Sequence, residues 1–412
     1  MPYSYRQNTL FCEDCALPWI AAEVGTPAYV YSAADIVDRF RAYDQAFAPI
    51  RHSICYAVKA NSNISILRLL ASLGSGFDIV SGGELFRVLQ AGGDPRKVVF
   101  SGVGKTAEEI QYALYNDIGS FNCESEAELE LLNAIAQQMG RKARVALRVN
   151  PEVDAATHPY ISTGMSEHKF GVDGSDVEAT YTRAAAMPNL QVEGVSCHIG
   201  SQILDPNPLM EAVDKMLLLV DRLRAIGIGI RHLDLGGGLG VPYRPDEQAP
   251  SIGQIVGGIL QRVDARDLDI SVEPGRSIVA ESGMLLTRVL YRKQTARKQF
   301  VVVDAAMNDL MRPALYKSHH EIVPVQLDRS RELITADVVG PICETGDFLA
   351  RDRDVASVQQ GELLGVCTAG AYGFAQSSNY NSRPRAVEVL VQGPSWTVIR
   401  RRESYDDLIR GE

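Results

Sequence analysis

The chain has 412 residues, a formal net charge of −10, and 46% hydrophobic against 22% charged residues. This length exceeds that of one ordinary hydrophobic core, so we expect two domains, and the composition is typical of a soluble globular protein. The acidic balance argues against non-specific binding to nucleic acid, which needs a basic face, and no apolar run is long enough to span a membrane.

The first ten residues are polar and lack the apolar region of a signal peptide, which predicts a cytoplasmic protein. Seven cysteines, scattered and odd in number, fit reduced cytosolic thiols. Cys12 and Cys15 form one C-x-x-C pair, but a zinc site needs a second half, which the sequence does not show. We therefore expect no bound metal.

Short β-branched runs alternate with helical patterns between residues 53 and 276. Strands are expected at residues 53–58, 77–80, 98–101, 120–123, 144–149, 192–198, 232–235 and 269–272. Helices are expected at residues 64–73, 83–91, 106–116, 125–139, 176–186, 208–226 and 252–263. Ser125 with Glu128 three residues later is a capping-box signature.

Eight strands alternating with helices predict an α/β fold, a (β/α)₈ TIM-like barrel, with an open doubly wound sheet as the structural rival. After residue 282, strand-like runs at 285–291, 300–304, 321–325, 337–340, 362–366 and 386–389 predict a second, mainly antiparallel β domain. The domains are therefore expected to be a barrel at residues 26–282 and a β-rich domain formed by 1–25 and 283–412, with the first 25 residues packed on the latter.

Polar and glycine residues follow several predicted strands, at the carboxyl ends where such a barrel places its active site. Lys59 follows the first strand, Asp78 lies in the second, and His198 ends the sixth, with Ser201 shortly after it. Three glycines, Gly236, Gly237 and Gly238, follow the seventh strand, and Glu273, Gly275 and Arg276 follow the eighth.

Each of these residues also has a purely structural explanation. A lysine at the end of an apolar strand needs a partner or a chemical role, and burial makes its amine usable for Schiff-base formation, but the side chain could also reach solvent. The glycines could form a tight turn only, or let backbone N–H groups approach a phosphate. His198 could be a packed histidine, and Glu273 could pair with an arginine. Together, a lysine, a phosphate cradle, a flat ring and a carboxylate are the set that holds pyridoxal 5'-phosphate.

The sequence resembles the diaminopimelate decarboxylases, which belong to the barrel (fold type III) class of pyridoxal-phosphate enzymes. The matching segments are 56–61, 77–85, 101–106, 148–151, 198–202, 232–240, 273–276, 307–316, 340–347 and 370–384. Several are shared with ornithine and arginine decarboxylases and so specify only cofactor and fold. Three segments are more specific for the diaminopimelate decarboxylases: 161–164 through 169–171, 307–313 and 378–384.

The resemblance implies decarboxylation of meso-diaminopimelate to L-lysine and carbon dioxide, the last step of lysine biosynthesis, with the cofactor held as a Schiff base on Lys59. By matching position, His198 stacks on the cofactor ring and Glu273 lies at the pyridine nitrogen. The remaining cofactor-binding residues implied are Asp78, Ser201, Gly236, Gly237, Gly238, Gly275, Arg276, Tyr372 and Tyr380.

For the substrate, the resemblance implies that Arg276, Arg312 and Tyr316 bind a carboxylate, a group that arginine grips bidentately. Cys343, Glu344 and Tyr372 match residues that the partner subunit contributes in this family, which implies a homodimer with shared active sites. Cys343 would return a proton to the α-carbon, since a thiol with a pKa of about 8.5 suits that task, although a cysteine by itself is more often a small buried apolar residue. Glu344 would pair with the distal ammonium.

Three alternatives stay open on the sequence. A related barrel decarboxylase would act on ornithine, lysine, arginine or carboxynorspermidine; a diamine-forming enzyme needs no grip on a distal carboxylate. A racemase on the same barrel would share the lysine and the phosphate cradle, but the segment at Cys343 and Glu344 disfavours it. A catalytically silent relative that only binds a protein partner would be expected to lose cofactor residues, and here Lys59, His198 and Glu273 all remain.

Overall fold

The structure is a computed structural model that describes residues 2–154, 169–172, 176–263 and 266–412. The chain divides into two compact units. The barrel unit comprises Arg39–Gly240 and Gln248–Gly275, and the β unit comprises Met1–Asp38, Val241–Glu247 and Arg276–Glu412. The expected domain division at residues 26 and 282 differs from the bounds of these units and stays a prediction.

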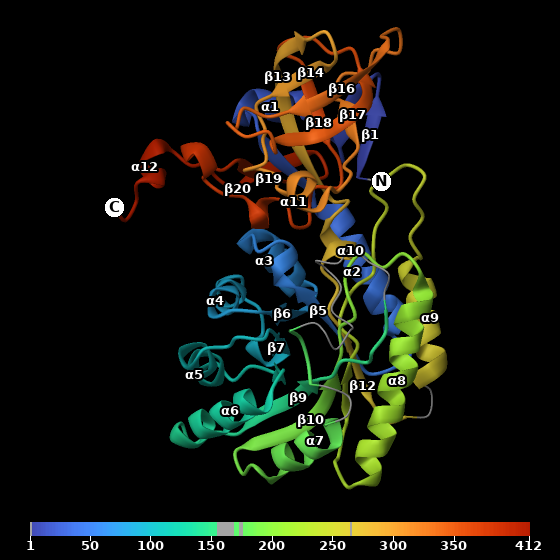
Figure 1. Cartoon of the computed structure of the whole chain (residues 1–412), viewed down its shortest axis with the longest axis vertical. Helices are drawn as coiled ribbons and strands as arrows, with labels where there is room; N and C mark the ends of the chain where they lie inside the picture. The colour runs from blue at the N-terminus through green and yellow to red at the C-terminus, as the bar shows by residue number, and fades with distance from the viewer. Residues whose placement is uncertain (1, 155–168, 173–175, 264–265) are drawn as a thin grey trace. The chain divides into compact units, whose positions relative to one another are not determined.

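The described strands of the barrel unit close into a parallel barrel in the order β10-β11-β12-β5-β6-β7-β8-β9 (Figure 1). Their bounds are β5 His52–Ala57, β6 Gly76–Ile79, β7 Val98–Phe100, β8 Ser120–Cys123, β9 Ala143–Arg148, β10 Leu190–Ser196, β11 His232–Asp234 and β12 Asp269–Val272. Closure confirms the predicted (β/α)₈ barrel and excludes the open sheet. Every predicted strand lies within two residues of an observed one, and β8 and β12 match at both ends.

Helices cover the outside of the barrel strands (Figure 1). They are α3 Ile64–Ser72, α4 Gly82–Gln90, α5 Ala107–Tyr115, α6 Glu126–Gln138, α7 Val177–Ala186, α8 Pro206–Ala225 and α9 Ile252–Val263. Helix α2, Ala33–Phe47, was not predicted, although Ile36, Phe40, Tyr43 and Phe47 recur at helical spacing and are buried.

The predicted capping box at α6 is half right. The Ser125 hydroxyl accepts a hydrogen bond from the Glu128 backbone N–H at 3.3 Å, as predicted. The Glu128 carboxylate, however, accepts from the backbone N–H of Glu124 and from Lys105 Nζ rather than from Ser125 N. A buried lysine attracts a carboxylate more strongly than a capping amide does, so Lys105 accounts for the difference.

The β unit is built on a mixed, mainly antiparallel sheet with the path β17-β16-β14-β13-β4-β19-β20, and β18 pairs with both β13 and β15. The bounds are β4 Ala28–Ser32, β13 Gly283–Gln294, β14 Gln299–Val303, β15 Ile322–Pro324, β16 Leu333–Val339, β17 Phe348–Ala356, β18 Leu363–Val366, β19 Val387–Gln392 and β20 Ser395–Arg400. All six predicted runs fall on these strands, whereas β4, β17 and β20 were missed. The short helices of this unit are α1 Leu17–Val24, α10 Arg276–Val279, α11 Arg312–Tyr316 and α12 Tyr405–Leu408.

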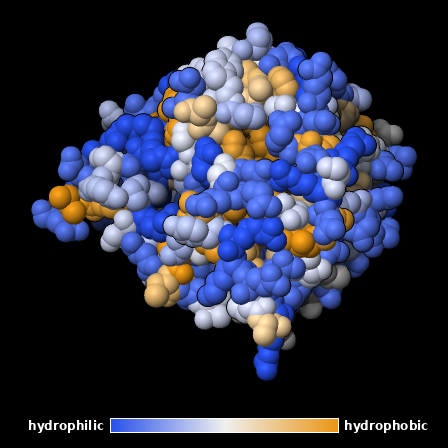
Figure 2. All heavy atoms as spheres, turned by 90° about the horizontal axis from the view of Figure 1, so that it is seen from above, coloured by the Kyte–Doolittle hydropathy of each residue, from blue (hydrophilic) through white to orange (hydrophobic). Residues whose placement is uncertain are grey.

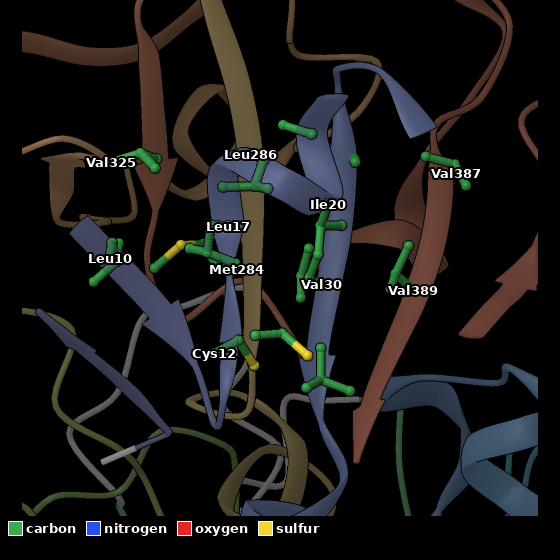
Figure 3. Close-up of a cluster of buried hydrophobic side chains, with 14 residues drawn as sticks. Leu10, Cys12, Leu17, Ile20, Val30, Met284, Leu286, Val325, Val387 and Val389 are labelled. Atoms are coloured by element: carbon green, nitrogen blue, oxygen red, sulfur yellow. The ribbon is translucent and has the colours of Figure 1, made fainter. Parts of the chain in front are cut away.

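The N-terminal residues belong to the core of the β unit, as expected. A small sheet of β1 (Tyr3–Arg6), β2 (Thr9–Cys12) and β3 (Cys15–Ala16) leads into α1. Side chains from β2 and α1 pack against Met284 and Leu286 of β13 and against the buried face of β19 (Figure 3). Cys12 and Cys15 are buried members of this apolar cluster and carry free thiols.

The face of the molecule drawn in Figure 2 is mostly hydrophilic, with apolar residues in small separate patches. Among the helices of the described residues, none is both long enough and apolar enough to cross a membrane.

Truncation of the core of the β unit tests how much this cluster stabilises the fold. We expect Leu286→Ala to lower the free energy of unfolding by about 2–5 kcal/mol, because Leu286 is fully buried and its removal leaves a cavity. The control Leu333→Ala, on the 71% exposed Leu333, should change it by about 0.5 kcal/mol or less. Equal losses in the two variants, measured by denaturant unfolding, would contradict the assignment of the core.

Candidate active site

A cavity of about 400 Å³ opens at the carboxyl ends of the barrel strands. Its lining includes Lys59, Ser101, Arg148, Ser196, His198 and Glu273, together with Lys169 and Phe170. The size falls within the range of small-molecule sites. Parallel closure causes this convergence, since every barrel strand ends on the same rim.

Lys59 has the partner that its position at the end of an apolar strand requires. The residue lies in a short 3₁₀ turn, Val58–Ala60, directly after β5. Its Nζ is 2.7 Å from Oδ2 of Asp78, whose side chain on β6 is fully buried while that of Lys59 is 37% exposed. The register of the two strands sets this pair, because Ala57 and Asp78 are neighbours across them. The amine therefore lies at the cavity, held by a buried opposite charge.

Glu84, on the first turn of α4, is a second, half-buried acid near this pair. Its Oε2 accepts the backbone N–H of Val80 at 2.7 Å. Desolvation and the Asp78 charge raise the pKa of Glu84 to about 7, while the Val80 hydrogen bond acts to lower it. No role for Glu84 was predicted from the sequence.

His198 presents a neutral flat ring to the cavity. Its Nδ1 accepts a hydrogen bond from the backbone N–H of Gly237 at 3.1 Å, which leaves the proton of the neutral ring on Nε2. Burial lowers the pKa of His198 well below its usual value, and the charges of Arg148 and Lys59 lower it further. The ring therefore offers an uncharged face across the pH range in which most enzymes work.

Glu273 follows β12 and lies next to a second carboxylate, Asp234, which ends β11. Both side chains are buried, with residue exposures of 6% and 0%. Ser101 Oγ donates to Glu273 Oε1 at 3.3 Å. Burial raises the pKa of Glu273 well above its usual value; the neighbouring charges of Asp234 and Asp78 add to this, and only Lys59 opposes it.

The glycines after β11 are needed for close backbone packing. A Cβ on Gly236, Gly237 or Gly238 would lie 2.5, 2.3 and 2.7 Å from the backbone oxygens of Cys197, Glu273 and Gly200, respectively. Two of the amides are also used inside the protein, because Gly236 N donates to Asp234 Oδ1 at 2.9 Å and Gly237 N donates to His198 Nδ1. The amides of Gly236 and Gly237 thus hold the turn together, and binding of a phosphate by these glycines stays a prediction.

Two further predicted contacts lie beside this turn. The segment that contains Ser201 runs along the glycine turn, with Ile203 N donating to Gly238 O at 2.9 Å. Gly275 lies against the lysine segment, where a Cβ would be 3.0 Å from the Cβ of Ala60. The structure thus brings Lys59, His198, Ser201, Glu273 and the glycines to one rim of the barrel unit.

The two predicted arginines meet within the β unit. Arg276 and Arg312 are both buried, and both lie over the ring of Tyr243, with the guanidinium carbons 5.7 and 4.4 Å from its centroid. Arg276 Nη1 donates to the Tyr243 hydroxyl at 2.6 Å and lies over the ring of Tyr372 at 4.9 Å. Arg312 Nη1 donates to Nε2 of His320 at 3.0 Å, and burial lowers the pKa of this histidine well below its usual value. The ring of Tyr243 thus holds two buried guanidinium groups close together.

Cys343 and Glu344 lie on the surface of the β unit. Cys343 is exposed, and its backbone N–H donates to Asn381 Oδ1 at 3.0 Å. The exposed Tyr380 donates its hydroxyl to Glu344 Oε2 at 2.9 Å, and its role in cofactor binding stays a prediction. Asp347 holds the loop in place by accepting the backbone N–H groups of Ile342 and Met307, each at 2.7 Å.

Tyr316 belongs to the same unit as the arginines. Its hydroxyl accepts from Nε2 of Gln376 at 3.2 Å. The diagnostic segment 161–164 lies outside the described residues.

Several residues of the site were missed by sequence reasoning. Asn122 and Asp234 surround Glu273, and Tyr243 and His320 hold the arginines. Asp234 and Asn122 each lie at or next to the end of a predicted strand, and this position is the one signal that could have identified them. Tyr243 and His320 carry no such signal, since they lie in irregular segments.

Comparisons with known proteins agree with the geometry. Residues 33–280 match the family model described as pyridoxal-dependent decarboxylase, pyridoxal binding domain. The chain is 57% identical over 410 residues to a diaminopimelate decarboxylase of Pseudomonas aeruginosa, covering 100% of this chain and 98% of that protein. It is 45% identical to the crystal structure of diaminopimelate decarboxylase from Helicobacter pylori complexed with L-lysine, with a TM-score of 0.92 over 96% of this chain and 98% of that one. The M. jannaschii diaminopimelate decarboxylase in co-complex with L-lysine is 38% identical, with a TM-score of 0.94 over 99% and 96% of the two chains.

The half-buried Glu84 carboxyl predicts a pH dependence of stability. Its pKa is about 7 in the folded chain against 4.5 for an ordinary glutamate, so the folded state binds more protons between these values. The free energy of unfolding should therefore fall as pH rises from 4.5 to about 7, and Glu84→Gln, which keeps an acceptor for Val80 N, should flatten that fall. The exposed Glu130→Gln on α6 is the control. Parallel pH profiles for wild type and Glu84→Gln in thermal unfolding would refute this assignment.

Proposed function

Since the chain belongs to the diaminopimelate decarboxylase family of the pyridoxal-dependent decarboxylases, we propose that it converts meso-diaminopimelate to L-lysine and carbon dioxide. This reaction is the last step of lysine biosynthesis, which we place in the cytoplasm. The observation that supports the proposal best is the single cavity lined by an amine, a neutral imidazole and a buried carboxylate: Lys59, His198 and Glu273.

The residues around this cavity fit pyridoxal 5'-phosphate. The cavity volume suits a small aromatic cofactor, and one oxygen of the buried Asp78, Oδ1, has no hydrogen-bond partner among the described residues. We propose that Lys59 holds the cofactor covalently, with His198 against the ring and Glu273 at the pyridine nitrogen. The phosphate would lie toward Ser201, Gly238 and Gly275, with Gly236 and Gly237 shaping the turn rather than donating from their amides.

When bound, pyridoxal phosphate supplies an electron-accepting ring that stabilises the carbanion left by loss of carbon dioxide. The chain's own groups prepare the site for that chemistry. Asp78 holds the Lys59 amine at the cavity, and the Gly237 amide fixes the orientation of His198. Glu273, within a low-dielectric pocket, is placed to hold a proton at a neighbouring ring nitrogen.

We propose that Arg276 and Arg312 bind a carboxylate of the substrate, with Tyr316 and Tyr372 beside them. The support is their shared stacking on the ring of Tyr243, which holds two buried guanidinium groups close together. A substrate with a carboxylate at both ends keeps one carboxylate for the arginines to bind after the other has left as carbon dioxide. The substrate of a diamine-forming decarboxylase has no such second carboxylate.

We further propose a homodimer in which Cys343, Glu344 and Tyr372 complete the active site of the partner subunit, and Tyr380 positions Glu344. Cys343 is exposed in the single subunit. A thiol that returns a proton to the α-carbon works in a site closed to water, so a partner subunit would have to cover it. Glu344 would hold the distal ammonium of the substrate, because a carboxylate pairs with a positively charged group.

Replacement of Lys59 tests the proposed activity. The purified wild-type protein should release carbon dioxide from meso-diaminopimelate and show an absorbance band of bound cofactor, and Lys59→Ala should lose both, because the covalent attachment is gone. Lys97→Ala, on a surface lysine that binds Gly74 O, is the matched control and should keep both. Turnover of ornithine with none of diaminopimelate would overturn the proposed substrate, and a racemised product would point to racemase chemistry.

Mixing inactive variants tests the shared active site. Lys59→Ala and Cys343→Ala should each be inactive, and their mixture should recover roughly a quarter of wild-type activity, because half of the dimers are hybrids with one intact site of two. The control mixture of Lys59→Ala with His198→Ala should stay inactive, since both residues come from the barrel of the same subunit. No recovery in the first mixture, despite a dimer by light scattering, would contradict the shared site.

A further inference from the structure

Glu273, at the carboxyl end of the barrel, lies beside a second buried carboxylate, that of Asp234, and the proposed function does not explain this pair. Asn122 Nδ2 donates to Asp234 Oδ2 at 2.8 Å and also lies 3.5 Å from Glu273 Oε1, so one amide group bridges the two acids. Both buried carboxyl groups therefore face the same amide nitrogen. Two ionised carboxylates can only accept hydrogen bonds, whereas a single proton between neighbouring carboxyl groups lets one of them donate.

The same pair is built into the backbone of the glycine turn. Asp234 Oδ1 accepts the amide of Gly236 at 2.9 Å, and the backbone N–H of Glu273 donates to the carbonyl of Gly236 at 2.7 Å. Ser196 Oγ lies 3.4 Å from the other Asp234 oxygen. Asp234 thus has neutral donors on both oxygens, and its position relative to Glu273 is set by the turn.

Among the described residues, the ion pairs of the nearest cations run to other carboxylates. The titratable and charged groups that face the pair or line the same cavity are Cys55, Lys59, Asp78, Arg148, Lys169, Cys197 and His198. Lys59 is paired with Asp78, and the buried Arg148 is paired with Glu124 at 3.1 Å.

Three of these neighbours are uncharged. Burial raises the pKa of both thiols, Cys55 and Cys197, and lowers that of His198. Two ionised carboxylates side by side at low dielectric repel strongly, and one proton relieves that repulsion.

We propose that Asp234 and Glu273 share a single proton in the cofactor-free protein, and that this proton is the one held at the ring nitrogen once the cofactor is bound. The inference rests on the proposed function for its second half only. The charge balances, because the pair goes from −1 to −2 as the ring gains one positive charge. Asp234 is thereby a positioning residue, which acts through Glu273 and supplies the proton without touching the cofactor.

The first half is tested without any cofactor. Infrared spectra of the full-length cofactor-free protein at about pH 8, where ordinary carboxyl groups are ionised, should show the C=O band of a protonated acid, shifted in D₂O. Asp234→Asn should lose that band, because the new amide donates permanently to Glu273 and removes the neighbouring charge. Glu273→Gln should lose it too, because Asp234 then ionises alone. Asp309→Asn is the matched control and should keep it, since Asp309 is a buried acid of the β unit whose pKa is about 7.

The second half is tested by counting protons. Calorimetric titration of pyridoxal phosphate into the cofactor-free protein, repeated in buffers of different ionisation enthalpy, gives the protons taken up on binding. Asp234→Asn should take up about one proton more than wild type, because the internal proton is no longer available. Asp309→Asn should match wild type.

The outcomes separate the two proposals. A band that persists in Asp234→Asn, or an equal proton count in Asp234→Asn and wild type, overturns the shared proton. If Asp234→Asn does not fold, the band in Glu273→Gln decides: its persistence overturns the proposal, and its loss supports it. Wild-type protein that shows the band but binds no pyridoxal phosphate would defeat the proposed function and leave the shared proton standing.

Discussion

Closure of the parallel barrel is the constraint on which the rest of the site depends. Closure leaves no sheet edge in the barrel, so the carboxyl ends of all its strands meet at one rim. Residues far apart in the chain become neighbours there: Lys59 after β5 and Asp78 on β6 form an ion pair, while His198 after β10 binds the turn that follows β11. Without closure, β5 and β12 would be the two edge strands of an open sheet in chain order, and Lys59 and Glu273 would lie far apart.

The electrostatics of the rim follow from how its charges are paired. Two cations of the rim, the partly exposed Lys59 and the buried Arg148, each pair with a carboxylate of their own. The hydrogen bonds given to Glu273 and Asp234 by Ser101 and Asn122 come from neutral hydroxyl and amide groups. The rim therefore carries negative charge that these hydrogen bonds do not neutralise, and a positively charged ring would balance it.

The β unit gathers positive charge. Arg276 and Arg312 share the face of Tyr243, with Tyr372 and His320 beside them. Aromatic rings hold guanidinium groups close together without cancelling their charge. Arg276 also follows Gly275 directly in the chain, so the segment after β12 carries the carboxylate of the barrel rim and a buried guanidinium within four residues.

The sequence by itself determined the barrel, because strand and helix periodicities are local and repeat with regular spacing. It also identified Lys59, His198, Glu273 and the glycines, since each directly follows a strand and closure of any such barrel brings strand ends together. Only the tertiary structure showed that Asn122 and Asp234, 112 residues apart, meet at Glu273, that Tyr243 holds the arginines, and that two glycine amides are used by the protein itself. These contacts depend on side-chain direction and on the register between distant strands, which no local pattern encodes.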